Sequence, residues 1–171
     1  MKRAVIYTDG ACTGNPGPAG IGVAMEFEGH SIHIAEHIGS ATNNIAEYSA
    51  LMRGLQEARD LGAQVVEVYM DSELAVKQVK GLYKVKNEGL RPIYQSVIKL
   101  LQSFKKHSVS HVPREQNALA DMLSKQGVKP GAKPFREVTP PFNDTGAPLK
   151  NKSVSPDTDN SGSGGQGSLP F

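Results

Sequence analysis

The chain has 171 residues, of which 38% are hydrophobic, and 19 Lys and Arg against 17 Asp and Glu leave a formal net charge of +2. This length suits one domain of about 100 to 150 residues plus an extra segment, and the small charge excludes a general nucleic-acid coat. A single cysteine, Cys12, excludes an internal disulfide and a zinc site built from several cysteines. Without a long apolar run near the N-terminus, we expect no signal peptide or membrane span, and a cytoplasmic monomer.

The first forty residues favour strands. Residues 2–8, 19–27 and 30–39 are rich in apolar and β-branched side chains, and a short turn at Glu28 and Gly29 separates the second from the third. This pattern predicts three antiparallel strands in sequence.

A long amphipathic helix is expected next. Residues 42–44 offer a helix N-cap, and apolar residues then recur at spacings of three and four until Gly62. Residues 63–71 predict a further strand. Because a helix separates this strand from the first three, a right-handed crossover into a parallel pairing is the expected topology.

Four more elements complete the expected domain. The pattern predicts helices over 72–80, 90–104 and 115–126, with a last strand over 106–112. Together the elements predict an α/β fold in which helices flank a five-stranded mixed sheet of strand order 3-2-1-4-5, within a domain of residues 1–128.

The last part of the chain has a different composition. From about Lys129 it is rich in Pro, Gly, Ser, Asn and Asp and has no sustained apolar period. Such a segment buries too little apolar surface to offset the entropy of ordering it, so we expect residues 129–171 to form a disordered tail. Phe135 and Val138 leave open a short strand added to the sheet.

Two aspartates stand where predicted strands end. Asp9 and Asp71 each follow an apolar run and precede a small residue. If these strands are parallel neighbours, their carboxyl ends meet at one edge of the sheet, where α/β proteins place ligands. Two like charges at that edge require a cation or a proton.

Two further acids lie on predicted helices. Glu47 could close a capping box, and Asp121 could be a solvated helical residue. Taken with Asp9 and Asp71, they form a set of oxygen ligands without cysteine or paired histidines. Such a set suits Mg²⁺ or Mn²⁺ rather than zinc.

Four stretches, YTDGACTGNPGPAGIG, TNNIAEYSAL, VYMDSELAV and HVPREQNALADMLS, occur in this order. They resemble the type 1 ribonuclease H family, which cleaves the RNA strand of RNA–DNA hybrids, and the likeness covers about residues 1–127. The resemblance implies an RNase H-like fold and two Mg²⁺ or Mn²⁺ ions per site. It further implies products with 5′-phosphate and 3′-hydroxyl ends, and catalytic, metal-binding roles for Asp9, Glu47, Asp71 and Asp121.

The resemblance also implies substrate contacts, with Glu47 near the ribose 2′-hydroxyl and a glycine-rich loop that lets the backbone approach the hybrid. Turn and capping roles are the alternatives for the asparagines Asn15, Asn43 and Asn44. The expected substrate-binding residues are Gly10, Cys12, Gly14, Asn15, Asn43, Asn44, Ser72 and Asn117.

Two departures from the family pattern concern a histidine and the basic surface. His111 precedes Asp121 by ten residues, the interval of a proton-shuttling loop histidine in the family, but Val112 and Pro113 replace the flexible glycine-containing loop. The Trp-containing basic insertion of some members is absent. Possible phosphate contacts are Lys77, Lys80, Lys84 and Lys86, although a solvated helix face explains them too.

The final six residues, QGSLPF, are similar to short peptides that dock on the bacterial sliding clamp. Gln166 would anchor such a peptide, and Leu169 and Phe171 would enter an apolar pocket. The alternatives are binding to single-stranded-DNA-binding protein and an inert tail.

The leading functional hypothesis is a metal-dependent endonuclease that cuts the RNA of RNA–DNA hybrids in primer and R-loop removal. One alternative is a nuclease of the same fold that acts on DNA strand-exchange structures. The other is a catalytically silent module that only binds hybrids.

Overall fold

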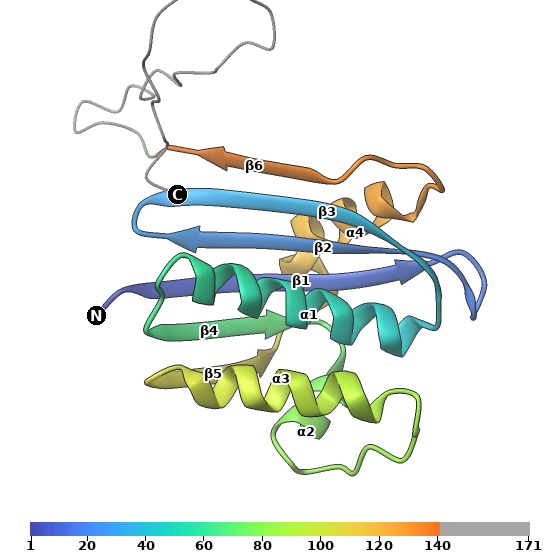
Figure 1. Cartoon of the computed structure of the whole chain (residues 1–171), viewed down its shortest axis with the longest axis horizontal. Coiled ribbons are helices and arrows are strands. Elements are labelled where there is room, and N and C mark those ends of the chain that lie inside the picture. The colour runs from blue at the N-terminus through green and yellow to red at the C-terminus, as the bar shows by residue number, and fades with distance from the viewer. Residues whose placement is uncertain (141–171) are drawn as a thin grey trace, which may run out of the picture.

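A six-stranded mixed sheet runs through the structure, a computed structural model that describes residues 1–140 (Figure 1). The strand order is β5-β4-β1-β2-β3-β6. β1 is antiparallel to β2 and parallel to β4, β4 is parallel to β5, and β3 is antiparallel to β2 and β6. The strands are β1 Arg3–Cys12, β2 Gly17–Phe27, β3 His30–Ala41, β4 Val65–Met70, β5 Lys106–His111 and β6 Phe135–Thr139.

Helices cover both faces of this sheet. α1 and α3 lie on the face toward the viewer in Figure 1, and α4 lies behind the sheet. The helices are α1 Asn43–Asp60, α2 Glu73–Val79, α3 Arg91–Ser103 and α4 Ala118–Val128, with the 3-10 helix η1 at Arg114–Asn117. Within residues 1–140, no helix is both long and apolar enough to span a membrane.

The main core lies between the sheet and the helices α1 and α3. Ile6 of β1, Leu51 of α1 and Val68 of β4 are fully buried there. On the opposite face, α4 packs directly against the backbone of β2. A Cβ atom at Gly22 would lie 2.2 Å from the carbonyl oxygen of Ala120, so only glycine permits this approach.

The expected strand order is confirmed, but the expectation of five strands is wrong. A sixth strand, β6, forms within the segment that we assigned to the disordered tail, and it pairs with β3. Val138 packs against the main core, and Phe135 packs on the other face. Because the stretch FREVT is only five residues long and has two apolar residues, the average composition of residues 129–171 conceals it.

The expected loop from Gly10 to Gly20 is shorter in the structure. β1 continues to Cys12 and β2 begins at Gly17, so the connection is a tight hairpin turn. The first two strands are therefore longer than the apolar pattern indicated.

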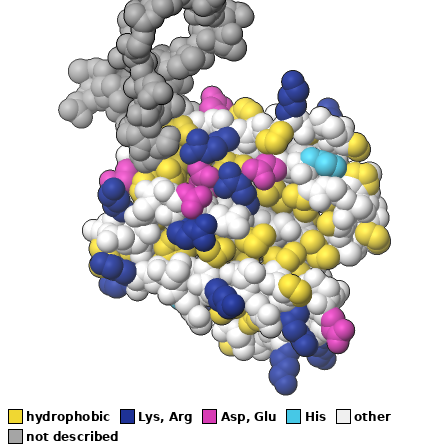
Figure 2. Space-filling model, viewed as in Figure 1, with side chains coloured by type: hydrophobic (Ala, Val, Ile, Leu, Met, Phe, Trp, Pro, Cys, Tyr) yellow, Lys and Arg dark blue, Asp and Glu magenta, His cyan; other side chains and the backbone are white. Residues whose placement is uncertain are grey.

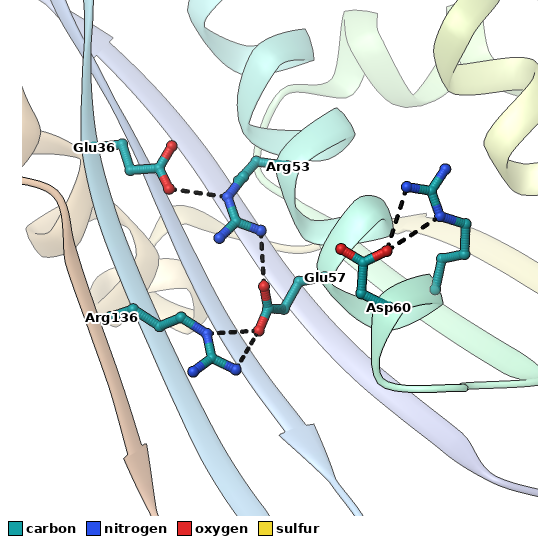
Figure 3. Close-up of polar contacts among 6 residues, drawn as sticks. Glu36, Arg53, Glu57, Asp60 and Arg136 are labelled. Atoms are coloured by element: carbon teal, nitrogen blue, oxygen red, sulfur yellow. Dashed lines mark hydrogen bonds and ion pairs between the residues drawn. The ribbon is translucent and has the colours of Figure 1, made fainter. Parts of the chain in front are cut away.

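An ion-pair network joins β3, α1 and β6 (Figure 3). Glu57 of α1 is 6% exposed, and its carboxylate binds Arg53 at 2.8 Å and Arg136 of β6 at 2.6 Å. Arg53 also contacts Glu36 of β3 at 2.9 Å. Arg136 thus ties the sixth strand to the long helix.

Replacing Arg136 with leucine is expected to lower the free energy of unfolding by about 1 to 3 kcal/mol, because buried Glu57 loses one of its two cations. Urea denaturation measures the change. Arg59→Leu is the control, since Arg59 and Asp60 form an exposed pair with 54% and 66% side-chain exposure. The control should cost less than about 0.5 kcal/mol, and equal losses in the two variants would contradict the prediction.

Candidate active site

Three carboxylates converge at the carboxyl ends of β1 and β4. The parallel register of these strands ends with Tyr7 opposite Tyr69, and Asp9 and Asp71 each lie two residues further on. Glu47 of α1 faces them, and ligand oxygens of the three side chains lie within 4.8 Å of one another. The structure therefore brings together three of the four acids predicted from the sequence.

The position of Glu47 depends on a close approach between β1 and α1. A Cβ atom at Gly10 would lie 2.4 Å from the backbone nitrogen of Glu47. Gly10 thus allows the helix to pack against β1, and its predicted substrate contact stays a prediction.

The capping-box alternative for Glu47 is wrong. Thr42 is the N-cap of α1, and its hydroxyl accepts a hydrogen bond from the backbone nitrogen of Ile45 at 3.3 Å. Because α1 begins at Asn43, Glu47 is the fifth helical residue rather than the third. Its carboxylate is therefore available to the carboxylate cluster.

The fourth acid, Asp121, lies beside this group rather than within it. It is on the first turn of α4, and its carboxylate forms an ion pair with Lys125 at 2.9 Å. A hydrogen bond also links Asp121 to Asp9. Asp121 is thus connected to the cluster through Asp9 rather than solvated alone.

The electrostatic environment favours a proton on Asp9 and Glu47. Burial, together with the charge of Asp71 and contact with Asp121, raises the pKa of Asp9 to about 8. Burial likewise raises the pKa of Glu47 to about 7, although a hydrogen bond with Ser72 opposes the shift. For Asp121, burial acts in the same direction, but Lys125 and Asp9 outweigh it and lower the pKa.

This group of residues fits a hard divalent cation. One buried oxygen of Asp71, Oδ2, has no hydrogen-bond partner among residues 1–140. Buried polar atoms without partners are rare, and a carboxylate oxygen aimed at other carboxylates is best satisfied by a cation. All the ligands are oxygens, which suits Mg²⁺ or Mn²⁺.

Arg114 is a site residue that the sequence interpretation missed. It lies on η1, and its positive charge opposes the rise in the pKa of Glu47 that burial causes. The same charge adds to the effect of Lys125 and Asp9, which lower the pKa of Asp121. The residue stands in the quoted stretch HVPREQNALADMLS, but a lone arginine outside a periodic basic pattern gave no signal. Its influence on two acids follows from the fold.

The structure places His111 at the edge of the site. It is the exposed last residue of β5, opposite Met70 in the register with β4. The pKa of Glu73 on α2 is lowered mainly by Lys77, with a smaller contribution from His111, whereas His111 does not contribute to the pKa shifts of Glu47 and Asp9. A catalytic role for His111 stays a prediction.

Three of the predicted substrate residues form a hydrogen-bonded group at the β1–β2 turn and the start of α1. The side-chain oxygen of Asn15 accepts from the backbone nitrogen of Asn43 at 3.1 Å, and the Cys12 thiol donates to the Asn43 side chain at 2.9 Å. Gly14 and Asn44, which adjoin Asn15 and Asn43 in the sequence, are exposed to solvent. The group presents amides at the surface beside the carboxylates.

Two other predicted substrate residues have internal partners. The Ser72 hydroxyl caps α2 by accepting from the backbone nitrogen of Ala75 at 3.2 Å. Asn117 is only 1% exposed and donates to the carbonyl oxygen of Thr8 at 3.0 Å. The structure buries this side chain against β1, and a substrate contact at Asn117 stays a prediction.

The predicted phosphate contacts lie around the connection between α2 and α3. Figure 2 shows Lys and Arg side chains gathered over this lower part of the molecule. Lys80, Lys84 and Lys86 are exposed, whereas Lys77 pairs with Glu73 at 2.9 Å and lies 5.1 Å from the centre of the Tyr83 ring. The proposed docking residues Gln166, Leu169 and Phe171 lie outside the described part of the chain.

Comparisons with known proteins agree with this geometry. The family described as reverse transcriptase-like matches residues 7–127. A ribonuclease H of Nitrosomonas eutropha is 34% identical over 148 residues, and the match covers 75% of this chain and 91% of that protein. The bifunctional protein Rv2228c of Mycobacterium tuberculosis is 41% identical over 133 residues, which span 76% of this chain but only 36% of that relative.

A solved structure shows the same fold. LC11-RNase H1, isolated from compost and solved in complex with an RNA/DNA hybrid, is 41% identical. The match has a TM-score of 0.68 and covers 73% of this chain and 96% of that one. The family match over residues 7–127, the 34% identity along most of a ribonuclease H, and the common fold show that this chain belongs to the type 1 ribonuclease H family.

Proposed function

We propose that this protein is an endonuclease that hydrolyses the RNA strand of RNA–DNA hybrids. The observation that carries the proposal is the cluster of Asp9, Glu47 and Asp71, whose ligand oxygens lie within 4.8 Å of one another at the carboxyl ends of parallel strands. The similar LC11-RNase H1 structure contains an RNA/DNA hybrid, which supports the substrate class.

Asp9, Glu47 and Asp71, with Asp121 beside them, would hold two Mg²⁺ or Mn²⁺ ions. Such ions would lower the pKa of an attacking water and stabilise the leaving 3′ oxygen, and the expected products would carry 5′-phosphate and 3′-hydroxyl ends. The carboxylates themselves orient the site. A bound cation would favour the ionised form of Asp9, and the positive charge of Arg114 favours the ionised forms of Glu47 and Asp121.

Recognition of the hybrid is assigned to the amides beside the carboxylates. Asn15 and Asn43 are held by their mutual hydrogen bond, and amides can donate to and accept from ribose hydroxyls and base edges. Glu47 would lie near the ribose 2′-hydroxyl, the group that distinguishes RNA from DNA. The exposed lysines at 80, 84 and 86 would contact backbone phosphates.

The test is cleavage of a labelled RNA–DNA hybrid beside matched DNA and RNA duplexes, with Mg²⁺, with Mn²⁺ and with a chelator. The proposal predicts metal-dependent cutting confined to the RNA strand of the hybrid. Binding without cutting under every metal condition would instead favour a silent hybrid-binding module.

Arg114→Gln is expected to move the acidic limb of the pH–rate profile toward higher pH. Without the arginine, the pKa values of Glu47 and Asp121 should rise. At a pH below the pKa, each unit of rise lowers the ionised fraction of a carboxyl group about tenfold. The rate of hybrid cleavage between pH 5 and 9 measures this shift.

Arg114→Lys is the control for this change, because it keeps the charge and should retain most of the wild-type profile. A glutamine variant with an unshifted profile would show that Arg114 does not act on these acids.

A further inference from the structure

The segment 112–117 is tied to both strand ends that carry the aspartates. The backbone nitrogen of Val112 donates to the carbonyl oxygen of Met70 at 2.9 Å. The side-chain Nδ2 of Asn117 donates to the carbonyl oxygen of Thr8 at 3.0 Å. Met70 and Thr8 immediately precede Asp71 and Asp9, so each tie is one residue away from a carboxylate of the cluster.

These ties lie where the sheet no longer holds β1 beside β4. The register between the two strands covers Arg3–Tyr7 and Val65–Tyr69 and stops there. Interstrand hydrogen bonds keep neighbouring strands about 4.8 Å apart. Beyond Tyr7, other contacts must therefore fix the distance between the ends of β1 and β4. Asn117 supplies a hydrogen bond at the first residue past the end of the ladder.

The hydrogen bond of Asn117 is fully buried. Asn117 and Thr8 are each 1% exposed, so water does not replace the bond easily if it is lost. The residue also ends η1, which carries Arg114, and directly precedes α4, which carries Asp121 four residues later. A shift of Asn117 would therefore displace Arg114 and Asp121 relative to Asp9.

We propose that Asn117 is a positioning residue of the carboxylate site. Its amide fixes the end of β1 relative to η1 and α4, and so sets the spacing of Asp9 and Asp121 and the affinity for a divalent cation. This inference rests on the proposed function, because it assumes that the carboxylates bind metal. A hydrogen-bond donor is required at this position because it contacts a carbonyl oxygen, and its burial favours an uncharged donor.

The test compares Asn117→Leu with Gln78→Leu. Each change removes a buried side-chain amide that forms a hydrogen bond, and the amide of Gln78 accepts from the Tyr48 hydroxyl at 2.8 Å. Gln78 differs from Asn117 in that it lies on α2, outside the carboxylate site. Calorimetric titration with Mn²⁺ measures metal affinity, and cleavage kinetics separate kcat from KM for the hybrid. Both are recorded at a temperature where urea curves show every variant folded.

Asn117→Leu is expected to weaken Mn²⁺ binding about 10- to 100-fold and to lower kcat with little change in KM, because the hydrogen bond that holds the backbone beside the ligand Asp9 is lost. Gln78→Leu should lose stability but keep the wild-type Mn²⁺ affinity. Asn117→Gln keeps an amide donor on a longer side chain and should bind Mn²⁺ better than the leucine variant. Asn117→Ala replaces the leucine change if that variant does not fold.

Unchanged Mn²⁺ affinity and kcat in Asn117→Leu, with only a loss of stability, would overturn the inference. So would a glutamine variant that binds Mn²⁺ more weakly than the leucine variant. If the wild type binds Mn²⁺ but does not cut hybrids, and Asn117→Leu still weakens Mn²⁺ binding, then only the proposed function fails. A wild type that takes up no Mn²⁺ would overturn both.

Discussion

Replacing Asp9 with asparagine is expected to abolish cleavage of the RNA strand while the protein still binds the hybrid. Asp9 is the acid that links the cluster, since it lies with Glu47 and Asp71 and is hydrogen-bonded to Asp121. An amide keeps the shape but removes the negative charge that a divalent cation needs. We expect the cleavage rate to fall by at least about 10³-fold.

Binding should persist because it depends on other parts of the surface. Within residues 1–140, neither the asparagines Asn15 and Asn43 nor the exposed lysines form a hydrogen bond or ion pair with Asp9. A filter-binding or anisotropy titration with chelator present measures hybrid affinity beside the cleavage assay. Asp60→Asn, at an exposed position on α1, is the control and should keep wild-type cleavage.

The two results together separate an enzyme from a silent module. Loss of cleavage with retained binding supports catalysis by the carboxylates. An Asp9→Asn variant that still cuts at the wild-type rate would contradict the proposed site. Loss of both activities would instead show that Asp9 supports the fold of the binding surface.

Without metal, the free energy of unfolding is expected to decrease as the pH rises from 5 to 8. In the native protein Asp9 holds its proton up to a pKa of about 8 and Glu47 up to about 7. The same groups in an unfolded chain lose their protons near pH 4. The native state therefore binds more protons than the unfolded state across this interval, and its stability falls with rising pH.

Opposing groups act in a different pH range. Arg53 and Arg136 outweigh the effect of burial on Glu57 and lower its pKa, and the pKa of Asp121 is lowered as well. A lowered carboxylate pKa makes stability rise with pH only below about pH 4. Between pH 5 and 8 the effect of Asp9 and Glu47 should therefore dominate. Since one pKa unit corresponds to about 1.4 kcal/mol, we expect the free energy of unfolding to fall by several kcal/mol over this range.

Urea denaturation at pH 5, 6, 7 and 8 in the presence of chelator measures this dependence. Asp9→Asn should flatten the curve and make the metal-free protein more stable than the wild type at pH 8, because the amide cannot ionise. Mg²⁺ should raise the stability of the wild type most at pH 8, where protons compete least for the carboxylates. A wild-type curve that is flat or rises between pH 5 and 8 would contradict the prediction.

Much of the fold could be predicted from local sequence patterns. Apolar periods of two and of three to four placed the first five strands and the four α-helices in the correct order, and the helix between 30–39 and 63–71 indicated the parallel pairing. β6 lies in the segment predicted as a disordered tail, where a short added strand at Phe135 and Val138 was left open, because five residues with two apolar side chains carry a weak local signal. The strand is stabilised by its pairing with β3 and by the ion pair between Arg136 and Glu57, and both contacts join residues that are distant in the sequence.

The candidate site was predicted in part. Asp9 and Asp71 could be paired because each follows a strand and parallel strands end at one edge. Glu47 could not be separated from a capping residue, since that depended on whether α1 is capped at Thr42 or later. Arg114 carried no recognisable pattern, and its effect arises only where η1 meets α1 and α4.

The sequence by itself determined the order of the elements, the acids at the strand ends and the family resemblance, because these follow from periodicity and from short motifs. Which polar side chains lie at the surface beside the carboxylates, and which are buried, depends on the tertiary structure. Asn117 illustrates the difference, since it reaches the carbonyl oxygen of Thr8, 109 residues earlier in the chain. Burial and hydrogen bonding at such a separation depend on how sheet and helices pack, and no local pattern records that packing.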